Sequence, residues 1–520
     1  MRWTRAALLA SSLTVLLTTA CGAGPSHRPD VALDHPHSGS GPAAETSAAP
    51  PPPPQAQVPK TDLPWRDCAA PTFNLLGTPP PAGVTFECAE FSTPIDTGGA
   101  VLGTFRAAAV RARTAKTPAD AAPLVVTSGG DRSTTATLAG LAAGPERALL
   151  DSRPIVGVDR RGIGSSQPID CLPDDLRRGL ADNAQFTPGS EDRVRALATL
   201  SQDATIACQD FLQPYQATFD APHAADDIEQ LRKQWQVEHI DLLGTGNGAQ
   251  VAMSYAAKYG PHLARLVLDS PEASGADAAT RTEQQVKGAE AALTGFARRC
   301  ADLGCSLGPD PRAAVDDLMS RADSGQLGPV SAATLATTIT AFLGDPGALP
   351  PERITELADA LSAARTGDTG PIQALATRAG AAVGSDGQFV SRCSDDQRPA
   401  TPERATQLVG EWGTKYPAFG RSAATGLMAC AAWPAAQAPS LPEKITVPVL
   451  VLGTDADPVV GGDGRPSVTG ALGAAGARAS TVQWQGWGHP VFTHSGCAQQ
   501  NIVAYLKDAT LPDDGTACPA

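Results

Sequence analysis

The sequence predicts an α/β fold in which a mostly parallel sheet is covered by helices on both faces. Two observations lead to this prediction. Continuous apolar runs of strand length recur along the chain, and stretches with helical periodicity lie between several of them. Strands that are buried on both faces are continuously apolar in this way, and an intervening helix lets two strands run parallel. In such a sheet the ligand site lies at the carboxyl ends of the strands.

The expected elements alternate along the chain. Helical spacing is seen, for example, in Ile228, Leu231 and Trp235, at i, i+3 and i+7. A closing helix is expected around 502–506. The predicted strands are 101–109, 124–127, 154–158, 239–243, 264–268, 449–452 and 480–484.

The helical patterns divide the chain into a sheet domain and an insertion. From 276 to 440 the sequence is alanine-rich, with helical periodicity and no clear buried strand. The simplest architecture is therefore a core built from 65–275 and 441–520, interrupted by a helical cap at 276–440.

The first 64 residues predict export. Arg2 and Arg5 precede a short apolar run, and small residues then lead to Cys21. This is the pattern of a signal peptide, here 1–20. Small residues before a cysteine also resemble a bacterial lipobox, so Cys21 is the expected lipidation site and the expected link to the membrane. The alternative is an ordinary secretory signal and a secreted protein. Residues 21–64, rich in proline and alanine, are expected to form an extended tether.

Charge and cysteine content exclude some partners. The net charge is -14 and there is no block of lysine or arginine, so a nucleic-acid partner is not expected. The absence of a Cys-x-x-Cys motif or a His/Cys cluster argues against a metal site. Without Cys21 ten cysteines remain, and an even number in an exported chain favours disulfides. The connectivity stays open; local pairing is the simplest choice. It joins Cys68 to Cys88, Cys171 to Cys208, Cys300 to Cys305, Cys393 to Cys430 and Cys497 to Cys518.

The stretch 239–269 combines a strand-length apolar run, a glycine-rich turn and a helical pattern. Gly244, Gly246 and Ala249 match the dinucleotide fingerprint G-x-G-x-x-A, with Asp269 at about the right distance downstream. The same turn fits the nucleophile elbow G-x-S-x-G of an α/β-hydrolase if Gly246 replaces the serine.

Two later loops favour the hydrolase interpretation. Asp457 follows the strand 449–452, and His489 follows the strand 480–484. An elbow, then an acid, then a histidine is the order of the α/β-hydrolase triad, in which His489 would be the general base and Asp457 would orient it. The fold class is therefore an α/β-hydrolase with an inserted helical cap. A dinucleotide site would leave both loops without a role, so no nucleotide or other cofactor is expected.

At these positions the chain resembles a known family, the actinobacterial secreted tripeptidyl aminopeptidases, which are related to proline iminopeptidases. The resemblance covers 65–518 and includes the cysteine positions. It implies removal of short peptides from free N-termini, with the cap closing over the substrate. Its specific marks are the segment Gly-Val-Asp-Arg-Arg-Gly-Ile-Gly-Ser-Ser at 157–166, Leu-Val-Leu-Asp at 266–269, Cys393-Ser-Asp395, Asp457-Pro458, Gly488-His489 and the closing segment 511–518.

The chain departs from this family at the nucleophile. Where the family has the elbow serine, this sequence has Gly246, and glycine has no side chain with which to form an acyl-enzyme. Thr245 is one residue from the apex and Ser254 lies two helical turns beyond it. Glycine also tolerates the strained backbone of an elbow more readily than serine does.

The chain also departs from the family in the oxyanion loop. Where the family resembles Gly-Gly-Pro-Gly, this chain has Gly129, Gly130, Asp131 and Arg132. The backbone N–H groups of Gly130 and Asn247 are the candidates for the oxyanion hole. A carboxylate on Asp131 would oppose a developing oxyanion, and Arg132 would be placed to offset that charge.

Two functional hypotheses follow. The first is an exported cell-surface lipoprotein that is catalytically dead or severely impaired, and that binds a peptide or a small acyl ligand under its cap. The second is an active aminopeptidase or esterase that uses an unorthodox nucleophile, such as Thr245, or water together with His489 and Asp457.

Overall fold

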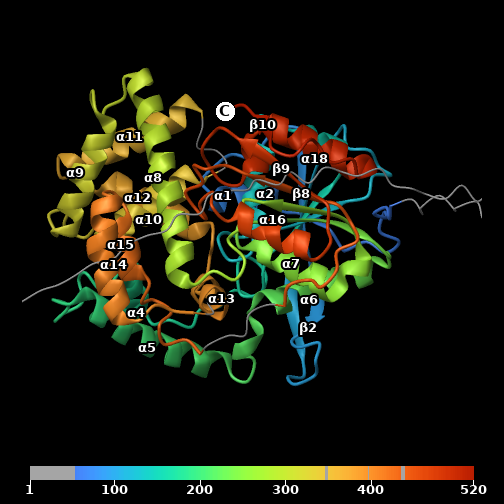
Figure 1. The fold of residues 1–520 in the computed structure, drawn as a ribbon, viewed down its shortest axis with the longest axis horizontal. Helices are drawn as coiled ribbons and strands as arrows, with labels where there is room; N and C mark the ends of the chain where they lie inside the picture. Colours follow the sequence, from blue (N-terminus) through green and yellow to red (C-terminus); the bar gives the residue numbers. More distant parts are fainter. Residues whose placement is uncertain (1–52, 346–349, 396–397, 435–439) are drawn as a thin grey trace, which may run out of the picture. The chain divides into compact units, whose positions relative to one another are not determined.

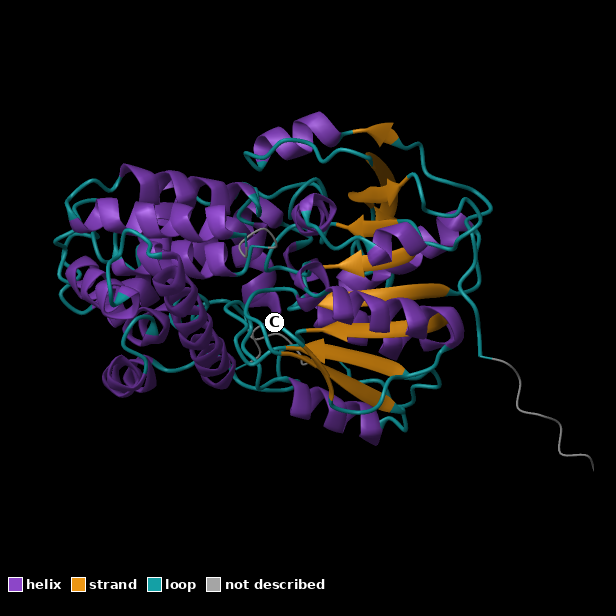
Figure 2. Ribbon diagram, turned by 90° about the horizontal axis from the view of Figure 1, so that it is seen from above, coloured by secondary structure: helices purple, strands orange, loops and turns teal. Residues whose placement is uncertain are grey.

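The structure is a computed structural model that describes residues 53–345, 350–395, 398–434 and 440–520. The predicted signal peptide and Cys21 lie outside the described residues. The described chain is organised around one sheet of ten strands (Figures 1 and 2).

The sheet is antiparallel at one edge and parallel over the rest. Its strand order is β1-β2-β3-β5-β4-β6-β7-β8-β9-β10, and all neighbours from β5 to β10 are parallel. The carboxyl ends of β4, β6, β7, β8 and β9 therefore meet at one edge of the sheet. The strands are β1 (Arg66–Asp67), β2 (Val84–Pro94), β3 (Thr104–Thr114), β4 (Leu124–Thr127), β5 (Ile155–Val158), β6 (Ile240–Thr245), β7 (Leu263–Asp269), β8 (Val449–Gly453), β9 (Ala479–Trp484) and β10 (Thr516–Cys518).

The central strands are buried along their whole length, which is why their sequences are continuously apolar. Every residue of β4 to β8 is buried. The strand predicted at 101–109 instead runs from Thr104 to Thr114, paired with β2, which the sequence analysis did not identify. The apolar Leu102 is 87% exposed in the connecting loop, whereas Val110 and Ala112 alternate with arginines inside the strand. An apolar run alone therefore misplaced this strand.

Helices cover both faces of the sheet (Figure 2). One face packs against α6, α7 and α16, and the opposite face packs against α1, α2, α3 and α18. Among the described residues, no helix is both long and apolar enough to cross a bilayer. The core helices are α1 (Ala69–Leu75), α2 (Thr134–Ala143), α3 (Ala148–Ser152), α6 (Ala221–Trp235), α7 (Gly248–Tyr259), α16 (Arg465–Ala474), α17 (Val491–His494) and α18 (Gly496–Asp508).

The cap contains two segments of the chain rather than one. The predicted insertion 276–440 forms α8 (Ala278–Leu303), α9 (Pro311–Asp323), α10 (Ala332–Leu343), α11 (Pro351–Arg365), α12 (Gly370–Ala381), α13 (Gly387–Asp395), α14 (Pro402–Lys415) and α15 (Gly420–Gly426).

A pair of helices from the segment predicted as core joins them. These are α4 (Asp174–Ala181) and α5 (Arg193–Leu212); α5 packs against α14 and α15, and α4 packs against α5 (Figure 1). Val194 and Leu197 of α5 are buried in the hydrophobic cluster of the cap. The core predicted at 65–275 thus contributes part of the cap, because an amphipathic helix does not encode locally which apolar surface will cover it.

The folded chain begins before residue 65. The last part of the predicted tether, 21–64, pairs with the core: the Gln57 N–H donates to the His239 carbonyl at 3.3 Å, and the Lys60 N–H donates to the Trp235 carbonyl at 2.9 Å. Leu63 is buried in the hydrophobic cluster beneath α6. The composition of this segment predicted a tether, but its backbone hydrogen bonds and one buried leucine attach it to the core.

Five disulfides stabilise the described chain, and they are the five local pairs expected from the sequence. Two of them close loops with a sequence separation of 37 residues, Cys171–Cys208 and Cys393–Cys430. The other three are Cys68–Cys88, Cys300–Cys305 and Cys497–Cys518. In the usual entropic account, closure of the longer loops restricts the unfolded chain most.

Candidate functional site

The turn after β6 has the geometry of a nucleophile elbow. Gly246 lies at its apex with a positive φ of 58°, and its N–H donates to the Asp269 carbonyl at 3.0 Å. The helix α7 begins two residues later at Gly248. A Cβ on Gly248 would lie 2.7 Å from the carbonyl carbon of Thr127, so this glycine is required for close packing against β4. The positive φ at Gly246 is the strained conformation that the sequence predicts for this position.

A side chain at residue 246 would point at His489. A Cβ built on Gly246 lies 3.1 Å from His489 Nε2 and closer than 3.0 Å to Asp131 Oδ2. The first distance places this glycine where a nucleophile would meet its general base. The second shows that a carboxylate from the oxyanion loop occupies the space that the side chain would take.

His489 and Asp457 are brought together as the sequence predicts. His489 Nδ1 lies 2.8 Å from Asp457 Oδ2, and Asp457 is fully buried. Asp457 Oδ1 accepts from the backbone N–H groups of Val459 and Val460 at 2.9 and 3.0 Å. With Nδ1 bonded to the carboxylate, Nε2 faces Gly246. Burial alone would lower the pKa of His489, but the charge and hydrogen bond of Asp457 outweigh it, so that this pKa lies above its ordinary value.

The two predicted oxyanion-hole donors are both engaged within the protein. The Asn247 N–H donates to Asp131 Oδ2 at 2.6 Å, and the Gly130 N–H donates to the side-chain oxygen of Asn247 at 2.9 Å. An oxyanion hole requires such groups to point, unoccupied, at the place where negative charge develops. Here each of them already has an acceptor.

The Asp131 carboxylate is in an environment that disfavours its charge. Removal of water inside the cavity, followed by the Coulombic effect of Glu272, raises the pKa of Asp131 to about 7, although the charge of His489 acts in the opposite direction. Arg132 does not offset this charge as expected. Its guanidinium Nη2 lies 4.0 Å from Asp345 Oδ2 and lines a different cavity.

A buried arginine, Arg160, positions the Asn247 side chain by a hydrogen bond. Arg160 Nη1 donates to the Asn247 side-chain oxygen and to Asp395 Oδ2, both at 2.7 Å, and the Arg160 side chain is fully buried. In the sequence, Arg160 and Asp395 stand out only as marks of the family resemblance, and no role was predicted for them. Two adjacent arginines directly after a buried strand were the available signal, because a buried arginine requires an acid.

A cavity of about 270 Å³ lies between the core and the cap, and we call it the elbow cavity. Its lining includes Asp131, Asn247, Glu272 and Pro458 from the core, and Thr337 and Leu427 from the cap. Neither Gly246 nor His489, both among the described residues, is part of its lining. Asp131 therefore stands where the cavity would otherwise open onto the histidine.

Thr245 lies away from the elbow cavity. It is the last residue of β6 and is 1% exposed, and it does not line the elbow cavity. Its hydroxyl is buried without a hydrogen-bond partner among the described residues.

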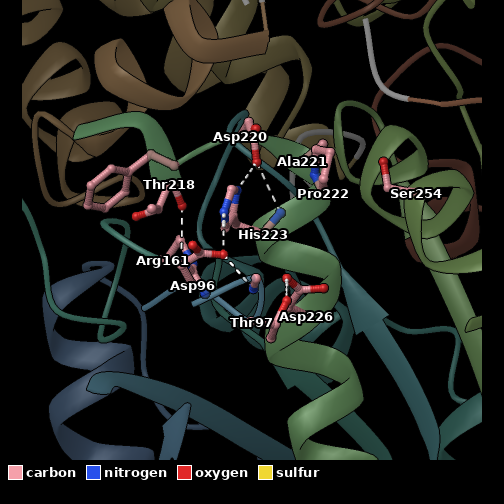
Figure 3. Close-up of polar contacts among 12 residues, drawn as sticks. Asp96, Thr97, Arg161, Thr218, Asp220, Ala221, Pro222, His223, Asp226 and Ser254 are labelled. Carbon is pink, nitrogen blue, oxygen red and sulfur yellow. Dashed lines mark hydrogen bonds and ion pairs between the residues drawn. The ribbon is translucent and has the colours of Figure 1, made fainter. Parts of the chain in front are cut away.

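A second histidine with acidic neighbours lies at the start of α6 (Figure 3). His223 Nδ1 is 2.5 Å from Asp220 Oδ1, and its Nε2 is 3.8 Å from Asp96 Oδ1 in the loop after β2. Ser254, on α7, stands apart from this ring in Figure 3, and its hydroxyl donates to the Gln250 carbonyl at 2.9 Å. The His223 group therefore joins a loop to a helix, and its recorded partners within the described part of the chain are acids rather than a nucleophile.

The described residues hold no cluster of histidine, cysteine, aspartate or glutamate that could bind a metal ion. The chemical groups at the elbow are the His489–Asp457 pair, the Asp131 carboxylate and the polar groups that line the elbow cavity.

Comparison with known proteins gives sequence matches to one family. The family model described as TAP-like protein matches residues 416–518. Serine protease Hip1 of Mycobacterium tuberculosis is 26% identical over 402 residues, which cover 70% of this chain and 74% of that protein. Tripeptidyl aminopeptidase of Streptomyces lividans is 30% identical over 115 residues, which cover 22% of this chain and 21% of that protein.

Among solved structures, esterase E22 covers 82% of this chain and 100% of its own at 13% identity, with a TM-score of 0.42. The assignment rests instead on the sequence matches and on the order of strands, elbow, acid and histidine found here. The chain has an α/β-hydrolase fold whose residues 416–518 match the TAP-like protein family, and its sequence is similar to a serine protease and to a tripeptidyl aminopeptidase.

Proposed function

We propose that this chain is a non-hydrolytic peptide-binding protein, a pseudoenzyme built on the TAP-like hydrolase fold. The observation that carries this proposal is the position of the Asp131 carboxylate. It fills the space above Gly246 that a nucleophile would need, and it accepts the Asn247 N–H at 2.6 Å. The site thus lacks a nucleophile and a free oxyanion hole, on which acyl transfer depends.

The charge of the site opposes acyl transfer as well. A tetrahedral intermediate would place a negative oxygen beside Asp131, and like charges at such distances repel strongly where water is excluded. Protonation of Asp131 would remove the repulsion, but its side chain would still occupy the hole. Substrate turnover therefore needs the carboxylate to leave and a nucleophile to be present.

The same charges suit a ligand with a free amino group. Asp131 and Glu272 both line the elbow cavity, and Glu272 makes no hydrogen bond or ion pair with the described residues. An ammonium group would satisfy both carboxylates and relieve their mutual repulsion. The relative named tripeptidyl aminopeptidase acts, by its name, on the amino ends of peptides. We infer a short peptide bound by its free N-terminus.

Export to the cell surface completes this proposal. Five disulfides support folding in an oxidising compartment outside the cytoplasm. Lipidation of Cys21 would then hold the binding domain at the extracytoplasmic face of the membrane, through the residues that precede Gln57. Incorporation of radiolabelled palmitate into the full chain, part of it released by mild alkali as expected for an ester, is the expected result of a labelling experiment, and Cys21→Ser should abolish the incorporation.

Water-mediated hydrolysis is the second candidate, and the intact His489–Asp457 hydrogen bond at 2.8 Å favours it. In that reaction His489 would deprotonate a water molecule, which would then attack a bound acyl group directly. The absence of His489 from the lining of the elbow cavity argues against it.

Hydrolysis and covalent labelling separate the two candidates. We expect the wild-type protein to show no labelling by a fluorophosphonate probe and no turnover of a tripeptidyl chromogenic substrate above that of His489→Ala. Turnover that His489→Ala abolishes would exclude the pseudoenzyme proposal and support activated water.

Calorimetric titration tests the ligand. We expect a tripeptide with a free N-terminus to bind, and its N-acetylated form to bind at least about tenfold more weakly, because one charge-assisted contact is lost. Glu272→Gln should produce a similar loss, whereas the exposed control Glu403→Gln should not. Equal affinity for the free and acetylated peptides would exclude a site for the peptide N-terminus. It would not bear on the proposal that the protein is non-hydrolytic, which the turnover assay tests separately.

A further inference from the structure

A second cavity, of about 490 Å³, lies on the other side of α10 from the elbow cavity. Thr337 and Thr340 line the elbow cavity, Thr338 and Phe342 line the second, and Ala341 lines both. The second cavity lies between α1, α2 and α17 of the core and α10, α11 and α12 of the cap. Because it contains Arg132, we call it the Arg132 cavity.

Its walls are mostly apolar. Ala136, Ala139 and Ala143 contribute one side of α2, while Phe342 and Leu375 face the cavity from the cap. Small side chains on α2 leave room for a ligand, and the aromatic ring and leucine offer hydrocarbon surface. A cavity of this volume and lining is in the range of sites that bury most of a small molecule.

Three arginines add positive charge to these walls, and they share two carboxylates. Arg378 donates to Glu356 at 2.5 Å, Arg353 pairs with the same carboxylate, and Arg353 Nη2 lies 3.8 Å from Asp345. The remaining guanidinium, that of Arg132, has Asp345 as its nearest carboxylate, at 4.0 Å.

Arg132 is the group that lacks a full set of partners. Its side chain is only 18% exposed, and it makes no hydrogen bond within the described residues. A guanidinium carries five N–H donors in a planar fork. No Arg132 nitrogen is among the fully buried, unpartnered polar atoms of the described residues, so its donors are accessible to a ligand in the cavity that Arg132 lines. Burial lowers the pKa of His494 to about 4, so this neighbouring ring in the same lining stays neutral at pH 7.

We propose that the Arg132 cavity binds an anionic amphiphile, a carboxylate with a medium-length hydrocarbon chain. The hydrocarbon chain lies along the alanines of α2 against Phe342 and Leu375. The carboxylate accepts two parallel N–H bonds from the Arg132 fork, the arrangement that arginine forms best with this group.

Calorimetric titration of the whole protein with decanoate tests the site, with decanol and decyltrimethylammonium as chain-matched ligands. We expect decanoate to bind most tightly. Arg132→Met keeps the length of the side chain and removes its charge, and should weaken decanoate binding about 10- to 100-fold, the value of charge-assisted hydrogen bonds. Arg404→Met, an exposed position on α14, should bind decanoate as the wild type does.

A second variant tests the cavity itself. Ala143 is exposed at the rim on α2, so Ala143→Trp should fold normally and obstruct the hydrocarbon chain. We expect it to weaken decanoate and decanol alike, whereas Arg132→Met should weaken only decanoate. Undiminished decanoate binding by both variants would overturn the proposal, and so would equal affinity for decanoate and decyltrimethylammonium. These outcomes are independent of peptide binding in the elbow cavity.

Discussion

The two halves of the elbow site differ in how much of a hydrolase they retain. The acid–base half keeps His489 on Asp457 at 2.8 Å, with Nε2 aimed at the elbow. The acyl-binding half has no side chain at Gly246, and Asp131 accepts the Asn247 N–H. Within one site, therefore, the groups that move a proton are in place and the groups that hold the reacting acyl carbon are not.

The difference shows that an intact histidine–aspartate pair is weak support for catalysis. Asp457 also accepts two backbone N–H groups, those of Val459 and Val460, which gives the residue a structural role in its loop. Gly246 has no comparable structural bond through a side chain, and glycine relieves the strain of a positive φ. The geometry of the His489–Asp457 pair therefore has a structural explanation that does not depend on catalysis.

Restoring the acyl-binding half should have the largest effect. Loss of the nucleophile from a serine triad costs on the order of 10⁶ in turnover. We expect Gly246→Ser combined with Asp131→Ala to produce hydrolysis of a tripeptidyl chromogenic substrate at least about 10³-fold above the wild type. Gly246→Ser alone should be about 10²-fold or more slower than the double variant, because Asp131 still occupies one oxyanion donor.

Two controls accompany this experiment. Gly246→Ala with Asp131→Ala opens the same space without a hydroxyl and should remain inactive. Addition of His489→Ala to the active double variant should abolish turnover. If Gly246→Ser alone is as active as the double variant, Asp131 does not obstruct the site. The acyl-binding half would then lack only the serine hydroxyl at position 246.

Asp457→Ala tests whether the retained half is structural. The substitution leaves two backbone N–H groups and the His489 ring without their acceptor, so we expect the free energy of unfolding to fall by about 2–4 kcal/mol. Urea denaturation measures this change. Asp455→Ala, which removes a carboxylate that is 77% exposed, is the matched control, and its ion pair with Arg465 should contribute no more than about 1 kcal/mol. Equal losses in the two variants would refute a structural role.

The parallel core was predictable because burial on both faces leaves a local signature. The run 124–127 is β4 without change of bounds, and the loops that carry Asp457 and His489 follow from the order of parallel strands. The contact between Asp131 and the Asn247 N–H joins residues 116 positions apart, and the sequence indicates only a carboxylate near the hole.

The parts that sequence reasoning missed depend on distant partners. The helix α5 could have covered the sheet but packs in the cap, because its apolar face suits either surface. The Arg160–Asp395 pair joins positions 235 residues apart, and no local pattern identifies such a pair. Arg132 was expected beside Asp131, but consecutive side chains in a loop point in different directions, and its guanidinium lies in the other cavity.

The pH dependence of stability should report the charge of Asp131. Burial raises the pKa of Asp131 in the folded protein from its ordinary value of 3.8 to about 7, so the folded protein holds a proton that the unfolded chain releases. Stability from this group is therefore present at low pH and is lost as pH rises from about 4 to 7. Asp131→Asn should reduce the loss of stability between pH 5 and pH 8 by about 1–3 kcal/mol.

Other groups also make the protein less stable as pH rises, and they determine the pH dependence that remains in Asp131→Asn. Burial raises the pKa of Asp269 and of Asp241 to about 6 each, and Asp457 raises the pKa of His489. The contribution of each of these three groups to the stability of the folded protein therefore also falls as pH rises. Urea denaturation at both pH values should therefore give a smaller slope for Asp131→Asn, not a flat line. The exposed control Asp455→Asn should follow the wild type. Parallel curves for Asp131→Asn and wild type would mean that Asp131 is not protonated in the folded state.

Of these substitutions, Glu272→Gln should change stability least, and it tests directly whether Glu272 and Asp131 interact. Glu272 is the largest charge effect that raises the pKa of Asp131, so its removal should lower the midpoint of the Asp131 transition by a fraction of a pH unit. The difference between the stability curves of Glu272→Gln and Glu272→Gln/Asp131→Asn isolates this midpoint. An unchanged midpoint would place Glu272 outside the reach of Asp131. A lowered midpoint, together with weaker binding of a free N-terminus, would identify the obstructing carboxylate as half of a site for a cation.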